Sequence, residues 1–163
     1  MVILNSSSSF SSYFIGYYTK YFPGSFFVNY AIIGVADCFT SLHSAVLTKF
    51  FPKITNTLSF ILLHSVFWCM VFVVVQEPYP MFVPFGILVL RLNMGTIANF
   101  GYHINQVLFP TEYRSLASGT MNFVGRSIGA TSVILVEYTT QPVMFVLVIC
   151  LFVFFCINGL ISE

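Results

Sequence analysis

The chain has 163 residues, of which 58% are hydrophobic and 7% are charged, and its mean hydropathy is +0.91. A soluble domain covers its surface with roughly 25% charged residues, so this composition excludes an ordinary soluble domain and indicates an integral membrane protein. The formal net charge of +1 excludes the basic surface that nucleic-acid binding requires. The lipid bilayer is therefore an expected partner, and nucleic acid is not.

Six apolar segments follow one another along the chain, each near the length of about 20 residues that a helix needs to cross the bilayer core. Their expected ranges are Val2–Tyr18, Phe26–Thr48, Thr57–Val75, Met81–Phe109, Ser115–Tyr138 and Pro142–Ile161. Serines dilute the first segment, so a frayed and partly exposed N-terminus is its alternative. We predict an all-α, multi-pass membrane bundle that forms one domain over residues 1–163.

Proline-containing breaks separate these segments, and nearby basic residues predict their orientation. Lys49, Lys53 and Arg114 fall in two loops that an alternating path places on one side, against Lys20 on the other. Because basic loops favour the cytosol, we expect the loops at Pro52 and Pro110 to be cytosolic, together with both chain ends. Thr111 is expected to cap the fifth helix, with Glu112 in its first turn.

The sequence shows no sign of enzyme or metal chemistry. It contains no HExxH, no GxSxG and no phosphate-binding glycine loop. Its four cysteines lie inside apolar stretches without metal-ligand spacing, and we interpret them as small buried hydrophobic residues. We therefore expect no catalytic residues, no metal and no cofactor. His43, His64 and His103 are interpreted as hydrogen-bonded packing residues rather than ligands or proton relays.

Ionisable residues at membrane depth cost at least ~2.5–3.5 kcal/mol on insertion scales and usually mark function. Asp37, Arg91 and Arg126 lie near the middle of the second, fourth and fifth segments. Polar or small residues accompany them at steps of three and four, which places each set on one helix face. These companions are Tyr30, Gly34, Ser41, Ser44 and Thr48 in the second segment; Gly95, Asn99, Tyr102 and Gln106 in the fourth; and Ser118, Asn122, Gly125 and Gly129 in the fifth.

Three inward polar faces predict a central hydrated cavity of the kind that a transporter or channel needs. Purely structural interpretations remain open. Asp37 and Arg91 could form one ion pair that only fixes the fold, and the small residues from Ser118 to Gly129 could serve helix packing. A channel is disfavoured because the chain has no ring-forming acidic motif and no filter-like loop.

The stretch Leu108–Arg114 (LFPTEYR) resembles the (L/I)-(F/Y)-P-T-x-x-R junction between the tenth and eleventh helices of the major facilitator superfamily. The organic ion transporters are the closest branch. Val124-Gly125-Arg126 resembles the V-G-R of the eleventh helix, and Arg91 matches the arginine of the tenth. Gly34-Val35-Ala36-Asp37 is similar to G-L-V-E of the eighth helix, with Asp in place of Glu.

The resemblance implies that the six segments are helices seven to twelve, one half of a twelve-helix transporter that works by alternating access. Helices seven, eight, ten and eleven would line the cavity. It implies transport of a small organic ion, and Arg126 favours an anion. The cavity residues would be Arg126, Asp37, Arg91, Asn99, Asn122 and Tyr102, and Pro110, Thr111 and Arg114 would belong to the gating junction.

The chain also departs from the family. Thr48–Lys53 does not match D-R-x-G-R-R, Val107 stands where the family has glutamate, and six preceding helices have no counterpart. We therefore expect a fragment or half-size carrier that pairs with another six-helix half or with itself. The alternative is a non-transporting remnant or membrane subunit that needs a partner half.

Overall fold

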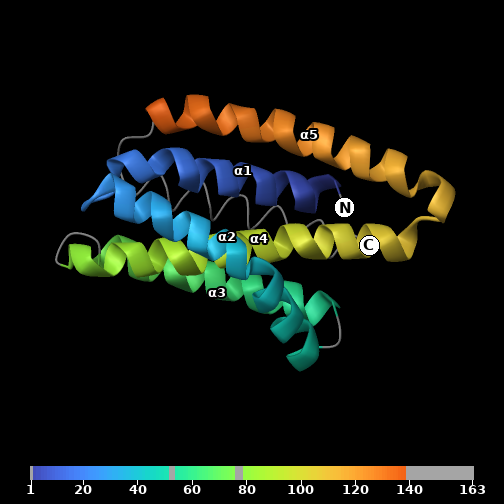
Figure 1. Ribbon diagram of the computed structural model, residues 1–163, viewed down its shortest axis with the longest axis horizontal. Coiled ribbons are helices and arrows are strands. Elements are labelled where there is room, and N and C mark those ends of the chain that lie inside the picture. The colour runs from blue at the N-terminus through green and yellow to red at the C-terminus, as the bar shows by residue number, and fades with distance from the viewer. Residues whose placement is uncertain (1, 52–53, 76–78, 139–163) are drawn as a thin grey trace.

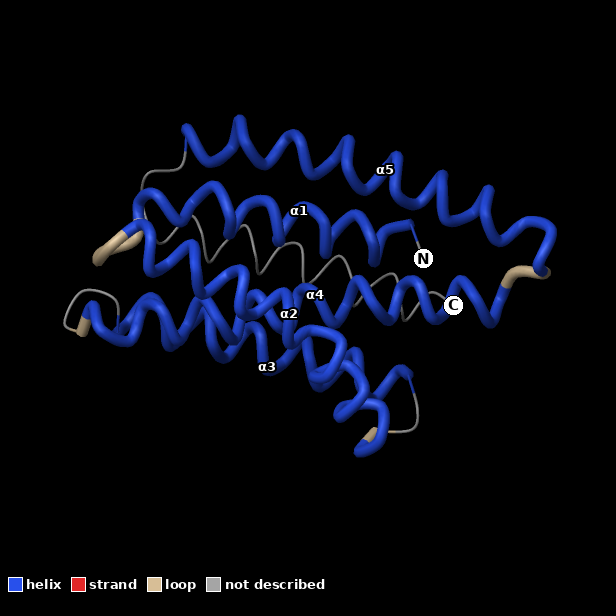
Figure 2. The backbone as a smooth tube through the Cα atoms, viewed as in Figure 1, coloured by secondary structure: helices blue, strands red, loops and turns tan. Residues whose placement is uncertain are grey.

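The computed structural model describes residues 2–51, 54–75 and 79–138. This part of the chain consists of α-helices and two short 3-10 helices, without strands (Figures 1 and 2). The elements are α1 (Val2–Tyr18), η1 (Thr19–Tyr21), α2 (Phe26–Phe50), α3 (Ile54–Val75), η2 (Pro80–Phe82), α4 (Val83–Leu108) and α5 (Thr111–Tyr138). The predicted all-α class is confirmed for these residues. The predicted sixth segment, Pro142–Ile161, lies outside them.

Several helix ends differ from the prediction by a few residues. The largest difference is at α5, which begins at Thr111 and not at Ser115. The backbone N–H of Tyr113 donates to the carbonyl of Pro110 at 3.1 Å, so the first turn forms directly after the proline. Thr111 is thus a helical residue, and its predicted role as the cap is wrong. Glu112 does lie in the first turn, where it favours the positive end of the helix dipole.

The central element is α4, which contacts each of the other four α-helices. In Figure 1 it lies between α1 and α3, and α2 crosses it. Ile87, Leu90, Met94 and Phe100 are at most 2% exposed, and they form the middle of the apolar core. Because α4 is buried on several sides, its polar residues must find partners on neighbouring helices.

The helices alternate in direction, as an up-and-down path requires. Figure 1 shows α1, α3 and α5 running one way and α2 and α4 running the other. The α2–α3 and α4–α5 connections consequently lie at the same end of the bundle, and Lys49 and Arg114 share that end. This agrees with the sidedness expected from the basic residues. Pro52, Lys53 and Glu77 lie outside the described residues.

The serine-rich α1 is a continuous helix packed between α4 and α5, so the alternative of a frayed N-terminus is wrong. Asn5, Ser7, Ser8 and Ser11 are each at most 5% exposed. The Asn5 amide donates to the carbonyl of Met121 at 2.9 Å. Serine tolerates burial here because small side chains let helices approach closely and hydroxyls can bond to backbone carbonyls.

Two glycines of α5 form the other side of this contact. A Cβ atom added at Gly125 would lie 2.8 Å from the Asn5 amide nitrogen, and one added at Gly129 would lie 2.5 Å from the Tyr13 ring. The two contacts follow one another along α1 and α5, which run in the same direction. For these two positions the helix-packing interpretation of the α5 small residues is the correct one.

A similar close approach joins α2 to α4. A Cβ atom added at Gly95 would lie 2.6 Å from Cγ2 of Thr40 and 3.3 Å from its Cβ. The Thr40 Cβ is fixed to the backbone of α2, so rotating the side chain does not relieve the contact. The absence of a side chain at Gly95 therefore sets how closely α2 and α4 pack.

We predict that Gly95→Ala destabilises the bundle by about 1–3 kcal/mol, because α2 and α4 must separate. The matched control is Gly101→Ala on the same helix, where an added Cβ meets nothing within 4 Å. There the helix preference of alanine should leave stability unchanged or raise it by roughly 0.5–1 kcal/mol. Thermal unfolding in detergent, followed by circular dichroism, measures both. Equal stability of the two variants would contradict the proposed packing constraint.

Candidate functional site

The Asp37–Arg91 ion pair is present and joins α2 to α4. Arg91 Nε donates to Oδ1 of Asp37 at 2.7 Å, and Nη2 donates to Oδ2 at 3.0 Å. This two-pronged geometry is the strong form of an arginine–carboxylate contact. The Arg91 side chain is 20% exposed and that of Asp37 is 47% exposed, so the pair stands at the edge of the core and not within it.

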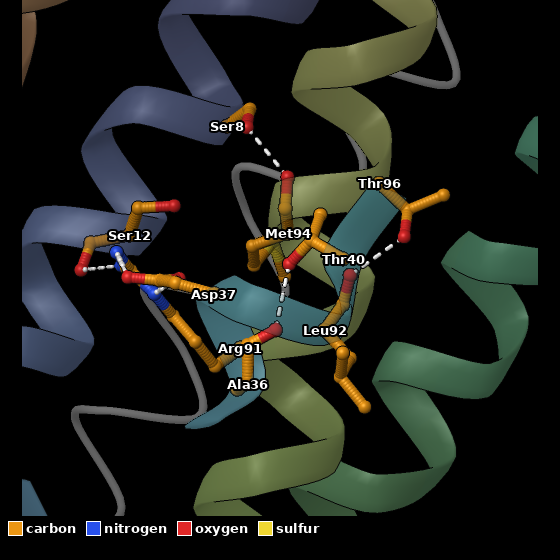
Figure 3. A network of polar contacts seen from close by, with 9 residues as sticks. All are labelled: Ser8, Ser12, Ala36, Asp37, Thr40, Arg91, Leu92, Met94 and Thr96. Carbon is orange, nitrogen blue, oxygen red and sulfur yellow. Dashed lines mark hydrogen bonds and ion pairs between the residues drawn. The ribbon is translucent and has the colours of Figure 1, made fainter. Parts of the chain in front are cut away.

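The third prong of Arg91 reaches α1. Its Nη1 donates to the backbone carbonyl of Ser12 at 2.8 Å, as Figure 3 shows. One turn earlier on α1, the Ser8 hydroxyl donates to the carbonyl of Met94 at 2.7 Å. A single guanidinium thus holds three helices together. The Ser8–Met94 hydrogen bond strengthens the same α1–α4 contact.

This ion pair forms part of the wall of a cavity of about 1060 Å³. The cavity lies between α1, α2, α4 and α5, and α3 provides none of its described lining residues. Polar or aromatic lining residues include Ser8, Ser9, Ser12, Tyr13, Tyr17, Lys20, Tyr30, Asp37, Arg91, Tyr102, Asn122 and Arg126. The four helices are those that the sequence resemblance assigns to a transport cavity.

Tyr102 and Asn122 meet across the cavity. The Tyr102 hydroxyl donates to Oδ1 of Asn122 at 2.6 Å, which links α4 to α5. Both side chains also line the cavity, so either can present a hydrogen-bonding group to a bound molecule. The sequence placed both residues on polar faces, but it gave no indication that they pair.

Arg126 lines the cavity from α5 and is exposed. Within the described part of the chain, the ion pairs are Asp37–Arg91 and Glu137–Lys20, and no carboxylate lies within ion-pair distance of Arg126. Arg126 therefore brings a positive charge to the cavity wall that the described residues leave uncompensated. It stands next to Gly125, whose helix face packs on α1.

Asn99 is the predicted cavity residue that the structure places elsewhere. It is half-buried on α4 and is not among the residues that line the cavity. The reason is helical geometry, since Arg91, Ala98 and Tyr102 form the lining of α4 and Asn99 lies about 100° around the helix from Ala98.

Pro110 lies in the connection between α4 and α5, and Thr111 and Arg114 lie at the start of α5, away from the cavity. Arg114 Nε donates to the carbonyl of Phe109 at 3.3 Å. Asn105, on the last turns of α4, donates to the hydroxyl of Ser118 at 2.5 Å. These bonds fix the turn between the two helices, and the three junction residues have no part in the cavity wall.

The resemblance places the first segment at the cavity, but none of the cavity residues predicted from the sequence lies on α1. Ser8, Ser12, Gly16 and Lys20 follow one another in steps of four and all line the cavity, as do Ser9, Tyr13 and Tyr17. This spacing is the same signal that identified the other three faces. The serines of α1 lower the apolarity of the segment and at the same time form a polar helix face, so this periodicity is masked by the composition.

Lys20 and Glu137 form an ion pair at the end of the cavity opposite the Pro110 connection, and Tyr21 adds a hydrogen bond to Glu137. The hydrogen bond to Glu137 raises the pKa of the Lys20 ammonium, which therefore stays charged throughout the physiological range. Both side chains are largely exposed, so the pair contributes little to folding.

No group of three or more histidine, cysteine, aspartate or glutamate side chains within the described residues could hold a metal ion. The described cavity wall offers the Asp37–Arg91 pair, the Arg126 guanidinium, the Lys20 ammonium that pairs with Glu137, the Asn122 amide, hydroxyls and aromatic rings. Comparison with protein-family models, with curated proteins and with solved structures finds no match to this chain.

We predict that Asp37 and Arg91 are energetically coupled. In a double-mutant cycle with Asp37→Ala and Arg91→Ala, the coupling energy should be about 1–3 kcal/mol, the range for neighbouring charged groups that share hydrogen bonds. Unfolding of all four proteins in detergent measures it. Arg91→Lys should recover only part of the stability lost in Arg91→Ala. The compact ammonium lacks the planar fork that lets arginine bond both the Asp37 carboxylate and the Ser12 carbonyl. Additive single-variant effects would contradict this role.

Proposed function

We propose that the chain is half of a membrane carrier that binds a small organic anion in the cavity between α1, α2, α4 and α5. The observation that carries the proposal is Arg126, a cavity-lining cation whose charge no described carboxylate neutralises. An organic anion would supply the missing negative charge. The tyrosines of the wall would contact its apolar part, and the Tyr102–Asn122 pair would offer hydrogen bonds.

Two features of the fold support a bilayer as the surroundings. The helices α2 and α4 are long and apolar enough to cross a membrane, with 25 and 26 residues. Large apolar side chains point outward, such as Phe27 at 82% exposed and Phe123 at 74%. A water-facing surface of this kind would promote aggregation, whereas lipid accommodates it. We infer that all five described helices span the membrane, in a multi-pass arrangement.

The hydroxyl groups fit the same environment. Thr40, Ser65 and Thr96 each donate to the carbonyl four residues earlier in their own helix, at distances of 2.7 to 2.9 Å. Hydrocarbon offers no hydrogen-bond partners, so a polar group in a membrane helix must be satisfied within the protein. These three hydroxyls thus do not require water.

Binding to the purified chain in detergent tests the proposed role of Arg126. The probe is 1-naphthoate, with neutral 1-naphthylmethanol as the matched ligand of similar shape. We expect Arg126→Gln to weaken 1-naphthoate binding by about 10- to 100-fold, because a hydrogen bond to a charged group contributes about 1.5–3 kcal/mol. Binding of the neutral alcohol should not change.

The control variant is Lys49→Gln, which removes one positive charge from the end of α2, away from the cavity lining. It should leave 1-naphthoate binding unchanged. In liposomes that contain a transport-competent assembly, Arg126→Ala should abolish uptake at unchanged protein level. Equal affinity of wild type and Arg126→Gln for 1-naphthoate would overturn the proposal.

A second candidate is a non-transporting subunit that requires a partner half. It is favoured by the cavity-facing side of α1 and α2, where Tyr13, Tyr17 and Tyr30 are 42%, 47% and 56% exposed beside charged groups. Lipid cannot satisfy these polar groups. Native mass measurement in mild detergent should then give a dimer or a heteromeric complex, and a stable monomer would argue against this candidate.

A further inference from the structure

A second polar cluster lies on the other side of α4, outside the cavity. Its centre is His64 on α3, which is half-buried. Trp68 Nε1 donates to Nε2 of His64 at 2.7 Å, one helical turn away. The side-chain nitrogen of Asn93 on α4 lies 3.2 Å from Nδ1, and Asn93 is 1% exposed. Both ring nitrogens of His64 are therefore engaged.

These contacts define the protonation state of the ring. An indole N–H can only donate, so Nε2 of His64 must be the unprotonated nitrogen. The neutral imidazole then carries its proton on Nδ1. A half-turn of the Asn93 amide, whose oxygen and nitrogen occupy equivalent positions, places an acceptor opposite that proton. In this arrangement both ring nitrogens of His64 have a hydrogen-bond partner.

A second proton on His64 is incompatible with the arrangement. The imidazolium would present Nε2–H to the Nε1–H of Trp68, and two donors cannot share a hydrogen bond. The Nδ1–H bond to Asn93 would persist and would be strengthened by the charge. Proton uptake must therefore break the His64–Trp68 bond while leaving His64 attached to α4, and the indole must rotate away.

Movement of the indole would change an apolar pocket. Trp68 lines a pocket of about 630 Å³ between α3, η2 and the start of α4, together with Phe72, Phe82 and Phe85. The Trp68 ring packs edge-on against the Phe85 ring, with centroids 5.3 Å apart. The pocket wall thus depends on an indole orientation that the hydrogen bond to His64 fixes.

We propose that His64 is a proton-binding site, and that proton uptake releases Trp68 and reshapes the apolar pocket between α3 and α4. The step takes one proton from the solvent, forms the Nε2–H bond and breaks one hydrogen bond. Histidine is the side chain whose charge ordinarily changes between pH 5 and 8. The inference does not rest on the proposed transport function, since neither the cluster nor its test involves a solute.

Among the described residues, the titratable ring that interacts with His64 is His43. His43 on α2 lies close enough to act on His64 electrostatically, and its Nδ1 is bonded to the Thr96 hydroxyl at 2.8 Å. On α4 the facing group is the uncharged Asn93, and Arg91 is occupied by Asp37. A charge on His43 would oppose proton uptake at His64, so His43 supplies a natural control.

The test uses Trp68 as a reporter, because it is the single tryptophan of the sequence. The full chain in detergent is titrated from pH 8 to pH 5, and the emission maximum and the acrylamide quenching constant are recorded. We expect the maximum to move to longer wavelength and the quenching constant to rise in one proton-dependent transition. Intensity alone is not sufficient, because an imidazolium quenches a neighbouring indole without any movement.

Three variants make the result specific. His64→Gln retains an acceptor for Trp68 but cannot gain a proton, so the transition should be lost. His43→Gln should retain it. Asn93→Leu removes the partner of Nδ1–H and should move the midpoint to lower pH, which provides a second test if His64→Gln fails to fold by circular dichroism. A flat wild-type titration, a transition that persists in His64→Gln or disappears in His43→Gln, or an unmoved midpoint in Asn93→Leu would overturn the proposal.

Discussion

The bundle depends on one guanidinium. Arg91 of α4 engages both carboxylate oxygens of Asp37 on α2 and a backbone carbonyl on α1, so α1 and α2 are both tied to α4 at one level (Figure 3). A partly buried guanidinium is stabilised when its N–H donors are used, and here three of them donate hydrogen bonds. Because the tie lies at the edge of the core, it also forms part of the cavity wall. Stability and the chemistry of the cavity therefore share the same residue.

The sequence predicted those features that a single residue type determines, such as a helix break at a proline or an ion pair at an apolar depth. Prolines at 23, 52 and 110 separate the helices close to the expected places, and Asp37, an acid near the middle of its apolar segment, pairs with Arg91. It was less informative about which neighbour a polar face contacts. Gly125 and Gly129 belong to the polar face of α5 but pack on α1, whereas Arg126, one position along, lines the cavity. A rotation of 100° around the helix decides whether a residue packs on α1 or lines the cavity. The spacing of polar residues within one helix does not show which neighbouring helix each of them faces.

Composition was misleading for α1. Six serines lower its apolarity, yet the helix packs between α4 and α5 and is one of the four helices that line the cavity. Small hydroxyl side chains cost little to bury when backbone carbonyls accept their hydrogen bonds, as Ser8 shows with Met94. The serine-rich α1 packs against both α4 and α5, whereas α3, which is more apolar, lies at the periphery of the described bundle.

The contact between Arg91 and α1 has a consequence for variation. Its acceptor is the main-chain oxygen of residue 12, which every amino acid provides, so the tie does not depend on the identity of Ser12. The Ser12 side chain meanwhile belongs to the cavity lining. Position 12 is thus a place where the shape and polarity of the wall could diverge between related chains, or accept a chemical label, while the framework that holds the three helices stays intact.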